Sequence, residues 1–293
     1  MQTTTTSPAI PAVPAVVREP AGGPTMRAIV LDRFGGLDVL INTEIPKPLP
    51  KPGEVVIRVK GFGINHAEMH MRRGEWAEAA EVSGIECVGI VDACPGGEFP
   101  VGAKVAALMG GLGRTINGSY AEYTRVRAEN VALVETDLPW DQLAALPETY
   151  ATAWTCLFRN LNIVAGQTLV IRGATSSFGQ AAVKLAVDAG AHVIATTRNR
   201  ERFGLLEGLD PIADFNPLLQ MSSGVNLTFF GSFVFGTEGF PLSDVPLQEI
   251  AAKVRDGHLD AAPSHVFSFD QIREAHRVME AGEAGGKMVV VVD

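Results

Sequence analysis

A turn of small residues joins a short apolar stretch to a helical pattern in this chain of 293 residues. The stretch Thr168–Arg172 predicts a β-strand, and the helix is expected to begin near Phe178. Such a turn directs backbone N–H groups and the positive end of a helix dipole at a ligand, usually a pyrophosphate. The predicted phosphate-binding residues are Gly173, Ala174, Thr175, Ser176, Ser177, Phe178 and Gly179. Serines replace two glycines of the G-x-G-x-x-G pattern, so an ordinary strand-to-helix turn is the alternative.

The end of the next predicted strand, Ala191–Thr197, indicates which dinucleotide would bind. Folds of this kind that prefer NAD carry an acidic residue there, which binds the ribose 2′-hydroxyl. This chain instead has Thr197, Arg198 and Arg200, whose hydroxyl and guanidinium groups can hold a 2′-phosphate through charge-assisted hydrogen bonds. The sequence therefore predicts NADPH over NADH. The alternative is that both arginines are solvated residues at the start of a helix.

A pair of histidines suggests a different chemistry. His66 and His70 are four residues apart, which on a helix would place both imidazoles on one face, as in zinc hydrolases. The H-E-x-x-H mechanism needs a glutamate directly after the first histidine, whereas Glu68 lies two residues on, about 200° around the helix. The spacing therefore disfavours a hydrolase, and a structural or partly exposed role for both histidines stays open.

The charge balance and the cysteines narrow the class of protein. Lys and Arg total 24 against 33 Asp and Glu, a net charge of −9, which disfavours binding to nucleic acid or to an anionic membrane. Cys87, Cys94 and Cys156 show neither C-x-x-C spacing nor an even count, so neither a disulfide framework nor a four-cysteine zinc site is expected. A reducing cytoplasm is the expected compartment.

Two segments resemble targeting or membrane sequences only superficially. Residues 1–25 are rich in Thr, Pro and Ala and lack a basic start and an unbroken apolar stretch, so we expect a disordered tail rather than a signal peptide. The uncharged residues 215–237 include several polar side chains, a proline and glycines, which argue against a transmembrane helix.

From Met26 to about Val134 the sequence predicts short strands separated by turns. Five motifs follow one another in and after this block: Gly63–Gly74, Ser83–Val91, Val101–Leu108, Gly118–Val126 and Leu146–Trp154. In this order they resemble the medium-chain dehydrogenase/reductase superfamily, specifically its zinc-free quinone oxidoreductase-like branch. The resemblance covers almost everything from Met26 to Asp293.

This resemblance implies an α/β fold with two domains and an active site between them. A GroES-like β-rich catalytic domain would comprise residues 26–147 and 259–293, and a shortened Rossmann-like cofactor domain residues 148–258. The returning segment has a strand, a helix over Phe269–Ala281 and a terminal strand. In that helix the apolar residues recur at helical spacing, which indicates a core-facing stripe: Ile272, Ala275, Val278 and Met279.

The resemblance also implies that no catalytic metal binds. In zinc-dependent members a Gly-His-Glu motif supplies a metal ligand, and the matching residues here are Gly84, Ile85 and Glu86. Isoleucine cannot bind zinc. A cysteine ligand of those enzymes would fall near Asn65, and asparagine is what zinc-free relatives carry there.

By resemblance, the reaction would transfer hydride from C4 of NADPH to the β-carbon of an enone, quinone or enoyl ester, followed by a proton. The residues expected near the nicotinamide are Asn65, Thr149, Phe230, Gly231, Ser232 and Lys287. Besides Asn65, the candidate catalytic residues are the possible proton donors or orienting groups His66, Glu68, His70 and Tyr150, and the sequence does not choose among them. Four apolar residues are either pocket-lining or ordinary core: Phe62, Trp76, Leu108 and Met109.

The cofactor domain departs from the family pattern because it is short. After a predicted helix at Arg200–Gly208 the chain passes to residues 211–220 and then to Val225–Phe235, which resembles the sixth Rossmann strand. Thr168–His258 has roughly 90 residues, whereas six strands with their crossover helices need roughly 130. The third, fourth and fifth strands are therefore expected to be missing, which would remove half of the cofactor cleft.

This deletion leaves several outcomes open. The sixth strand could move beside the first, a second chain could fill the gap, or the domain could be partly unfolded; an unpaired first strand favours pairing of some kind. We expect a homodimer, because relatives often pair their sixth strands. The leading function is an NADPH-dependent reductase. The alternative is a protein that has lost redox chemistry and uses the cleft for binding, or for isomerisation, cyclisation or elimination.

Overall fold

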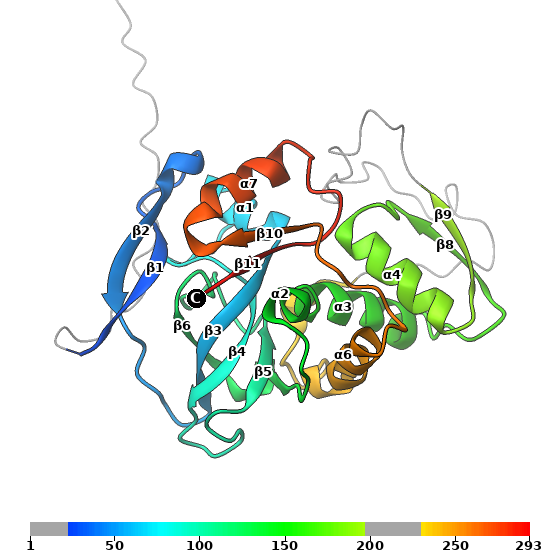
Figure 1. The fold of residues 1–293 in the computed structure, drawn as a ribbon, viewed down its shortest axis with the longest axis horizontal. Helices are drawn as coiled ribbons and strands as arrows, with labels where there is room; N and C mark the ends of the chain where they lie inside the picture. Colours follow the sequence, from blue (N-terminus) through cyan, green and yellow to red (C-terminus); the bar gives the residue numbers. More distant parts are fainter. Residues whose placement is uncertain (1–22, 197–229) are drawn as a thin grey trace, which may run out of the picture.

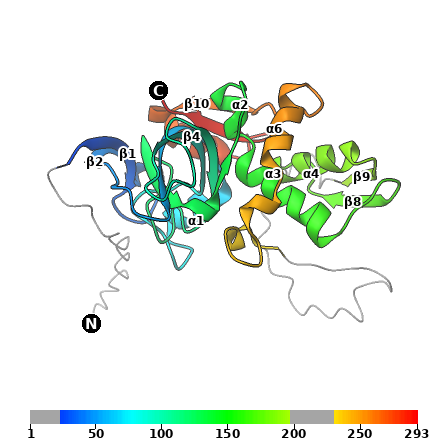
Figure 2. The same ribbon diagram turned by 90° about the horizontal axis from the view of Figure 1, so that it is seen from below.

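The computed structural model describes residues 23–196 and 230–293. In the described residues a β-rich part lies beside a part that carries helices and a small sheet (Figure 1). Seen from below, helix α3 lies between the large sheet and the small one (Figure 2). The predicted 2′-phosphate ligands Thr197, Arg198 and Arg200 and the predicted helix Arg200–Gly208 lie outside the described residues.

The β-rich part is built on the long strand β3, Glu54–Ile64. A seven-stranded sheet has the order β10-β11-β3-β4-β5-β7, with β6 also paired to β3, and β1 and β2 form a separate antiparallel pair. The bounds of the other strands are β1 Thr25–Leu31, β2 Leu40–Pro46, β4 Glu86–Ala93, β5 Lys104–Leu108, β6 Tyr123–Arg127, β7 Val131–Leu133, β10 His265–Ser268 and β11 Met288–Val291. The predicted run of short strands is confirmed.

The C-terminal segment returns to the β-rich part, as expected. Strand β11 runs antiparallel to β3, with Met288 opposite Ile64, and parallel to β10. This register brings the residue before Met288 next to the end of β3. Between β10 and β11, helix α7 (Ile272–Glu280) buries the predicted apolar stripe of Ile272, Ala275, Val278 and Met279.

Helices connect the two parts. Further helices in the described residues are α1 His66–Arg73, α2 Trp140–Ala144, α3 Pro147–Trp154 and α6 Leu247–Arg255, and α3 continues as a π-helical segment over Thr155–Asn160. Short 3-10 turns are Leu37–Val39, Ala128–Asn130, Ser232–Val234, Leu242–Asp244 and Phe269–Gln271. One apolar core includes side chains of β4, α3, α4 and α6, so it spans both parts.

The predicted strand–turn–helix is confirmed as β8 (Thr168–Arg172) and α4 (Ser177–Asp188), followed by β9 (His192–Thr196). Strands β8 and β9 are parallel, and in the described residues they form a sheet of two strands. Val170 and Ile194 are directly opposite each other in this register. Their side chains are 57% and 52% exposed, so one face of this sheet is largely uncovered.

The predicted sixth strand, Val225–Phe235, is wrong where the structure describes it. Residues 225–229 lie outside the described residues, and Ser232–Val234 forms a 3-10 turn instead of a strand. The Phe230 ring contacts those of Phe235 and Phe240, at centroid distances of 5.4 and 5.5 Å. Packing among these rings folds the segment back on itself, so an apolar composition that suited a strand forms a compact loop.

Candidate functional site

The turn between β8 and α4, residues 173–179, is the one that the sequence predicts to bind phosphate, and it is called the phosphate turn here. Gly173 has a φ of 65°, which favours glycine. Ser176 caps α4, because its Oγ accepts from the N–H of Gly179 at 3.0 Å and donates to the carbonyl of Gly173 at 2.9 Å. A Cβ on Gly179 would meet the carbonyl oxygen of Gly173 and lie 2.7 Å from Cα of Ala174. Glycine at 179 therefore permits the close approach of helix and turn.

This turn is tied to the segment that leads into β11. The side-chain nitrogen of Gln180 donates to the carbonyl of Thr175 at 2.9 Å and to the carbonyl of Gly285 at 3.0 Å. Gly285 is two residues before Lys287. The phosphate turn and the neighbourhood of Lys287 are thus held in a fixed relation.

At the other end of the site, Asn65 joins β3 to α1 and forms a capping box with Glu68. The backbone N–H of Asn65 donates to Oε2 of Glu68 at 2.9 Å, and the N–H of Ile85 donates to Oε1 of Glu68 at 3.3 Å. The Glu68 side chain is completely buried. Burial raises its pKa to about 7.

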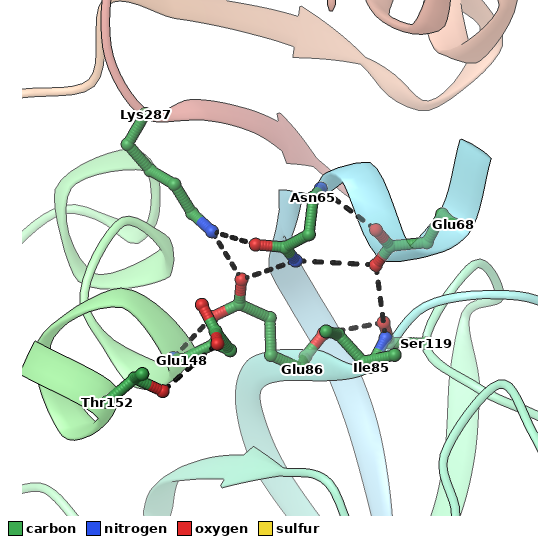
Figure 3. A network of polar contacts seen from close by, with 8 residues as sticks. All are labelled: Asn65, Glu68, Ile85, Glu86, Ser119, Glu148, Thr152 and Lys287. Atoms are coloured by element: carbon green, nitrogen blue, oxygen red, sulfur yellow. Dashed lines mark hydrogen bonds and ion pairs between the residues drawn. The ribbon is translucent and has the colours of Figure 1, made fainter. Parts of the chain in front are cut away.

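Glu86 and Lys287 form a buried ion pair beside Asn65 (Figure 3). Lys287 Nζ lies 2.6 Å from Oε1 of Glu86 and donates to Oδ1 of Asn65 at 2.7 Å. The amide nitrogen of Asn65 donates to the same Glu86 oxygen at 2.9 Å and, more weakly, to Glu68 at 3.4 Å. Glu86 is 0% exposed and Lys287 7%, so this charge pair is almost fully removed from water.

Gly63 makes room for this ion pair, and its replacement Gly63→Ala is expected to destabilise the protein by about 2 kcal/mol. The new Cβ would contact Oε1 of Glu86 and stand 2.6 Å from Nζ of Lys287, so one of the charged groups would have to move. Urea unfolding measures the loss. A matched control is Gly239→Ala, where a Cβ meets nothing within 4 Å. Equal stability of the two variants would contradict the prediction.

Glu148 extends the network from the start of α3. Its backbone N–H donates to Oε2 of Glu86 at 2.8 Å, and its Oε1 accepts from the hydroxyl of Thr152 at 3.0 Å (Figure 3). The side chain of Ser232 acts to lower the pKa of the Glu148 carboxyl. Burial raises the pKa of the Glu148 carboxyl; the positive charge of Lys287 opposes the rise, and the negative charge of Glu86 adds to it.

A pocket of about 820 Å³ connects the phosphate turn to this network. Ser177, from the first turn of α4, lines it together with Asn65, Glu148 and Ser232. Its apolar lining includes Ile64, Ile85, Met109, Met279 and Met288. The volume is within the usual range for a small-molecule site of roughly 300–1,000 Å³. An apolar cavity with a few convergent polar groups suits an apolar ligand that is oriented at one end.

The structure brings several predicted residues together at this pocket: Asn65, His66, Ser177 and Ser232 line it, and Glu68 and Lys287 lie in the adjoining network. Thr149 is buried on α3, directly after Glu148. The other predicted members of the phosphate turn, Gly173, Ala174, Thr175, Ser176, Phe178 and Gly179, lie around the first turn of α4. The role of each in binding or catalysis stays a prediction.

Other predicted residues have other neighbours. The Tyr150 hydroxyl points to the carbonyl of Asp260, 3.5 Å away, and burial raises its pKa to about 12. Nδ1 of His70 is 2.5 Å from a carboxylate oxygen of Glu75, and its ring stacks on Trp76. Phe230 and Gly231 precede the 3-10 turn that carries Ser232.

Of the four apolar candidates, Trp76 and Met109 line the pocket. Phe62 and Leu108 are completely buried core residues. The sequence pattern could not separate these pairs, because all four are large apolar side chains in or beside predicted strands.

Sequence reasoning missed Glu86 and Glu148 as members of the site. A signal was present for Glu86, which is the single charged residue of the apolar stretch Ser83–Val91. Acidic side chains are rarely buried unless they are paired. A carboxylate inside a predicted core strand therefore predicts that a basic side chain from elsewhere in the chain pairs with it. The sequence signal for Glu148 was weaker, because an acidic residue in the first turn of a helix is commonly explained by its favourable interaction with the helix dipole.

In the described residues, no group of three or more His, Cys, Asp or Glu side chains is arranged to hold a metal ion. No helix within residues 23–196 or 230–293 has the length and apolarity needed to cross a membrane.

A GroES-like sheet joined to a Rossmann-like strand–turn–helix defines the class of two-domain dehydrogenases and reductases. The sequence comparisons agree with that class. Residues 51–136 match the alcohol dehydrogenase GroES-like domain family, and residues 166–290 match a family described as zinc-binding dehydrogenase. The chain belongs to the medium-chain dehydrogenase/reductase superfamily and is a quinone oxidoreductase-like member of it.

Individual relatives support this assignment. A quinone oxidoreductase from Pongo abelii is 30% identical over 188 residues, which are 61% of this chain and 55% of the relative. The chain therefore spans about half the length of such curated relatives. Two solved structures share the fold at 20% identity: a quinone oxidoreductase from Coxiella burnetii (TM-score 0.70, 92% of this chain and 100% of that one) and a mycobacterial protein complexed with NADPH (TM-score 0.75, 91% and 99%).

Proposed function

We propose that this chain is a zinc-independent, NADPH-dependent reductase that transfers hydride to an enone, a quinone or an enoyl-type small molecule. The observation that carries the proposal is that one pocket is lined both by Ser177 of the phosphate turn and by Asn65 and Glu148 of the buried network. A dinucleotide that extends from the phosphate turn to the buried network would place its nicotinamide beside polar groups. The molecule that accepts the hydride would then lie against the apolar walls of the pocket.

The residues of this chain fit a dinucleotide. The first turn of α4 presents N–H groups that the helix itself cannot satisfy, and glycine at 179 leaves the backbone close to the turn. The nicotinamide would lie beside Asn65, Thr149 and Ser232. The cofactor supplies the hydride. The chain's own contributions are the fixed amide of Asn65, the apolar lining that excludes water, and a carboxyl group at the pocket wall.

The proposal is tested by calorimetric titration of the purified chain with NADPH and with NADH. We expect NADPH to bind at least about 10-fold more tightly, because Arg198 and Arg200 would each contribute a charge-assisted hydrogen bond to the 2′-phosphate. Arg198→Ala should weaken NADPH binding and leave NADH binding unchanged. The control is Arg127→Ala, an exposed arginine of β6. Equal affinities for the two dinucleotides would contradict the predicted preference.

One observation favours a second function, a non-redox isomerase, cyclase, lyase or binding protein that uses the same pocket. In the described residues the cofactor sheet has two strands, and Val170 and Ile194 are uncovered on one face. A catalyst that does not bind nicotinamide does not need the rest of the sheet. If the folded protein binds neither dinucleotide in the titration above, this second function replaces the reductase.

We also propose that the chain acts as a homodimer in the cytoplasm. The family resemblance supports the dimer. The three cysteines, which lack the spacing of a disulfide framework, support the reducing compartment. Sedimentation velocity at micromolar concentration tests the dimer, and a single monomeric species would refute it.

A further inference from the structure

We propose that Glu148 is the general acid that protonates the reduced acceptor, and that Glu86, Asn65 and Lys287 position it and control its charge. This inference rests on the proposed reductase function. It adds a residue that the sequence patterns did not single out.

The first argument is access to the pocket. Of the candidate proton donors, Glu68 is completely buried beneath Asn65, and the Tyr150 hydroxyl points to the carbonyl of Asp260. His70 does not line the pocket and is held by Glu75. His66 and Glu148 do line it.

The remaining acids on the pocket wall are differently placed. Glu75 and Glu78 are 45% and 47% exposed, and each faces a basic partner, His70 and Arg114 respectively. Each of these carboxyl groups is open to water and is already paired with its own basic side chain. Of the candidate proton donors in the described residues, Glu148 and His66 therefore remain.

The second argument is charge. Three carboxyl groups, of Glu68, Glu86 and Glu148, share one buried cation, Lys287 (Figure 3). Full ionisation would leave two negative charges without a cation, one of them completely buried and the other at the pocket wall, which is unfavourable. Glu86 has the best support for its charge, because it accepts from Lys287, from Asn65 and from the backbone N–H of Glu148. A proton that the cluster retains is therefore expected on Glu68 or on Glu148, and not on Glu86.

Burial raises the pKa of both of those groups, and only Glu148 opens onto the pocket. The groups that face Glu148 are Glu86 from β4, Lys287 before β11, Ser232, and Thr152 and Cys156 from the helical segment that begins with α3. The Thr152 and Ser232 hydroxyls can donate to the carboxylate that remains once the proton has left.

The proposed step balances as follows. Hydride delivered to the β-carbon adds two electrons to the acceptor, which becomes an enolate. The O–H bond of Glu148 breaks, and its proton forms a new C–H or O–H bond on that enolate. Glu148 remains as a carboxylate beside Thr152, and it takes a proton from water when the product leaves the pocket.

The test compares Glu148→Gln with His66→Ala and with the exposed control Glu249→Gln, all as full-length chains. Turnover of NADPH with an enone or a quinone should fall about 100-fold or more in Glu148→Gln, with KM within about 2-fold. Wild-type turnover should fall as the pH rises and Glu148 loses its proton, and this fall should be absent in Glu148→Gln. Infrared spectra of the protein without cofactor should show the band of a protonated carboxyl that Glu148→Gln removes.

The outcomes distinguish Glu148 from His66 as the proton donor. Full turnover of Glu148→Gln, or an unchanged carboxyl band, would overturn the assignment of Glu148, and a loss confined to His66→Ala would assign the proton to His66. Calorimetry with NADPH shows that each variant still binds the cofactor. A wild-type protein that binds NADPH and turns over no acceptor would overturn the reductase proposal together with this inference.

Discussion

Replacement of Lys287 by methionine is expected to lower the free energy of unfolding by about 3–5 kcal/mol at pH 8. Lys287 is the partner of a carboxylate that is 0% exposed, and Met fills a similar volume without the charge. Glu86 would then keep only the N–H groups of Asn65 and Glu148. Urea unfolding of the variant and of the wild type at pH 8 measures the loss.

Two further variants isolate the cause. Lys253→Met removes a lysine whose partner, Asp188, is 28% exposed, so its cost should stay below about 1 kcal/mol. Adding Glu86→Gln to Lys287→Met should recover much of the stability, since no buried charge is then left without a partner. A loss in Lys287→Met that the second substitution does not reduce would refute the ion-pair explanation.

The stability of the protein should depend on pH through Glu68. Its folded-state pKa of about 7 lies above the value of 4.5 expected when unfolded, because burial favours the neutral carboxyl. A carboxyl with a raised pKa contributes stability below about pH 4.5 and loses it as the pH rises through 7. The total loss is about 3 kcal/mol, from roughly 1.4 kcal/mol for each pKa unit. Glu68→Gln should abolish this part of the pH dependence.

The measurement is the difference in unfolding free energy between wild type and Glu68→Gln at pH 5, 6, 7 and 8. His276 acts in the opposite direction, because burial lowers its pKa to about 3 and stability is therefore lost as the pH falls below about 6.5. That contribution is common to both proteins and cancels in the difference. Glu249→Gln, at an exposed site, should show a difference that does not change with pH. The same flat result for Glu68→Gln would mean that Glu68 is ionised throughout.

Local patterns were sufficient to predict the elements that hold the site. The apolar stretch Thr168–Arg172 and the turn of small residues after it gave β8 and the start of α4, and helical spacing gave the buried face of α7. The strand predicted at Val225–Phe235 failed in its described part, because contacts among Phe230, Phe235 and Phe240 outweighed local β preference.

The site itself depended on contacts that are distant in sequence. The pairing of Glu86 with Lys287 joins residues 201 positions apart, through the register of β11 on β3. No spacing rule predicts such a partner. The family resemblance predicted that Asn65 and Lys287 both lie near the nicotinamide. It did not predict that they hydrogen-bond to each other and to Glu86, as the structure shows.

The small sheet of β8 and β9 and the helix α4 depend on the rest of the chain for their stability. The buried side chains of α4 belong to one apolar core that also includes side chains of α3, α6 and β4. Gln180 and Lys184 of α4 are also bonded to Gly285 and Asp260, which lie far along the chain. We therefore expect that the part with β8, β9 and α4 loses its structure when it is separated from the β-rich part, and that the two parts unfold cooperatively in the intact chain.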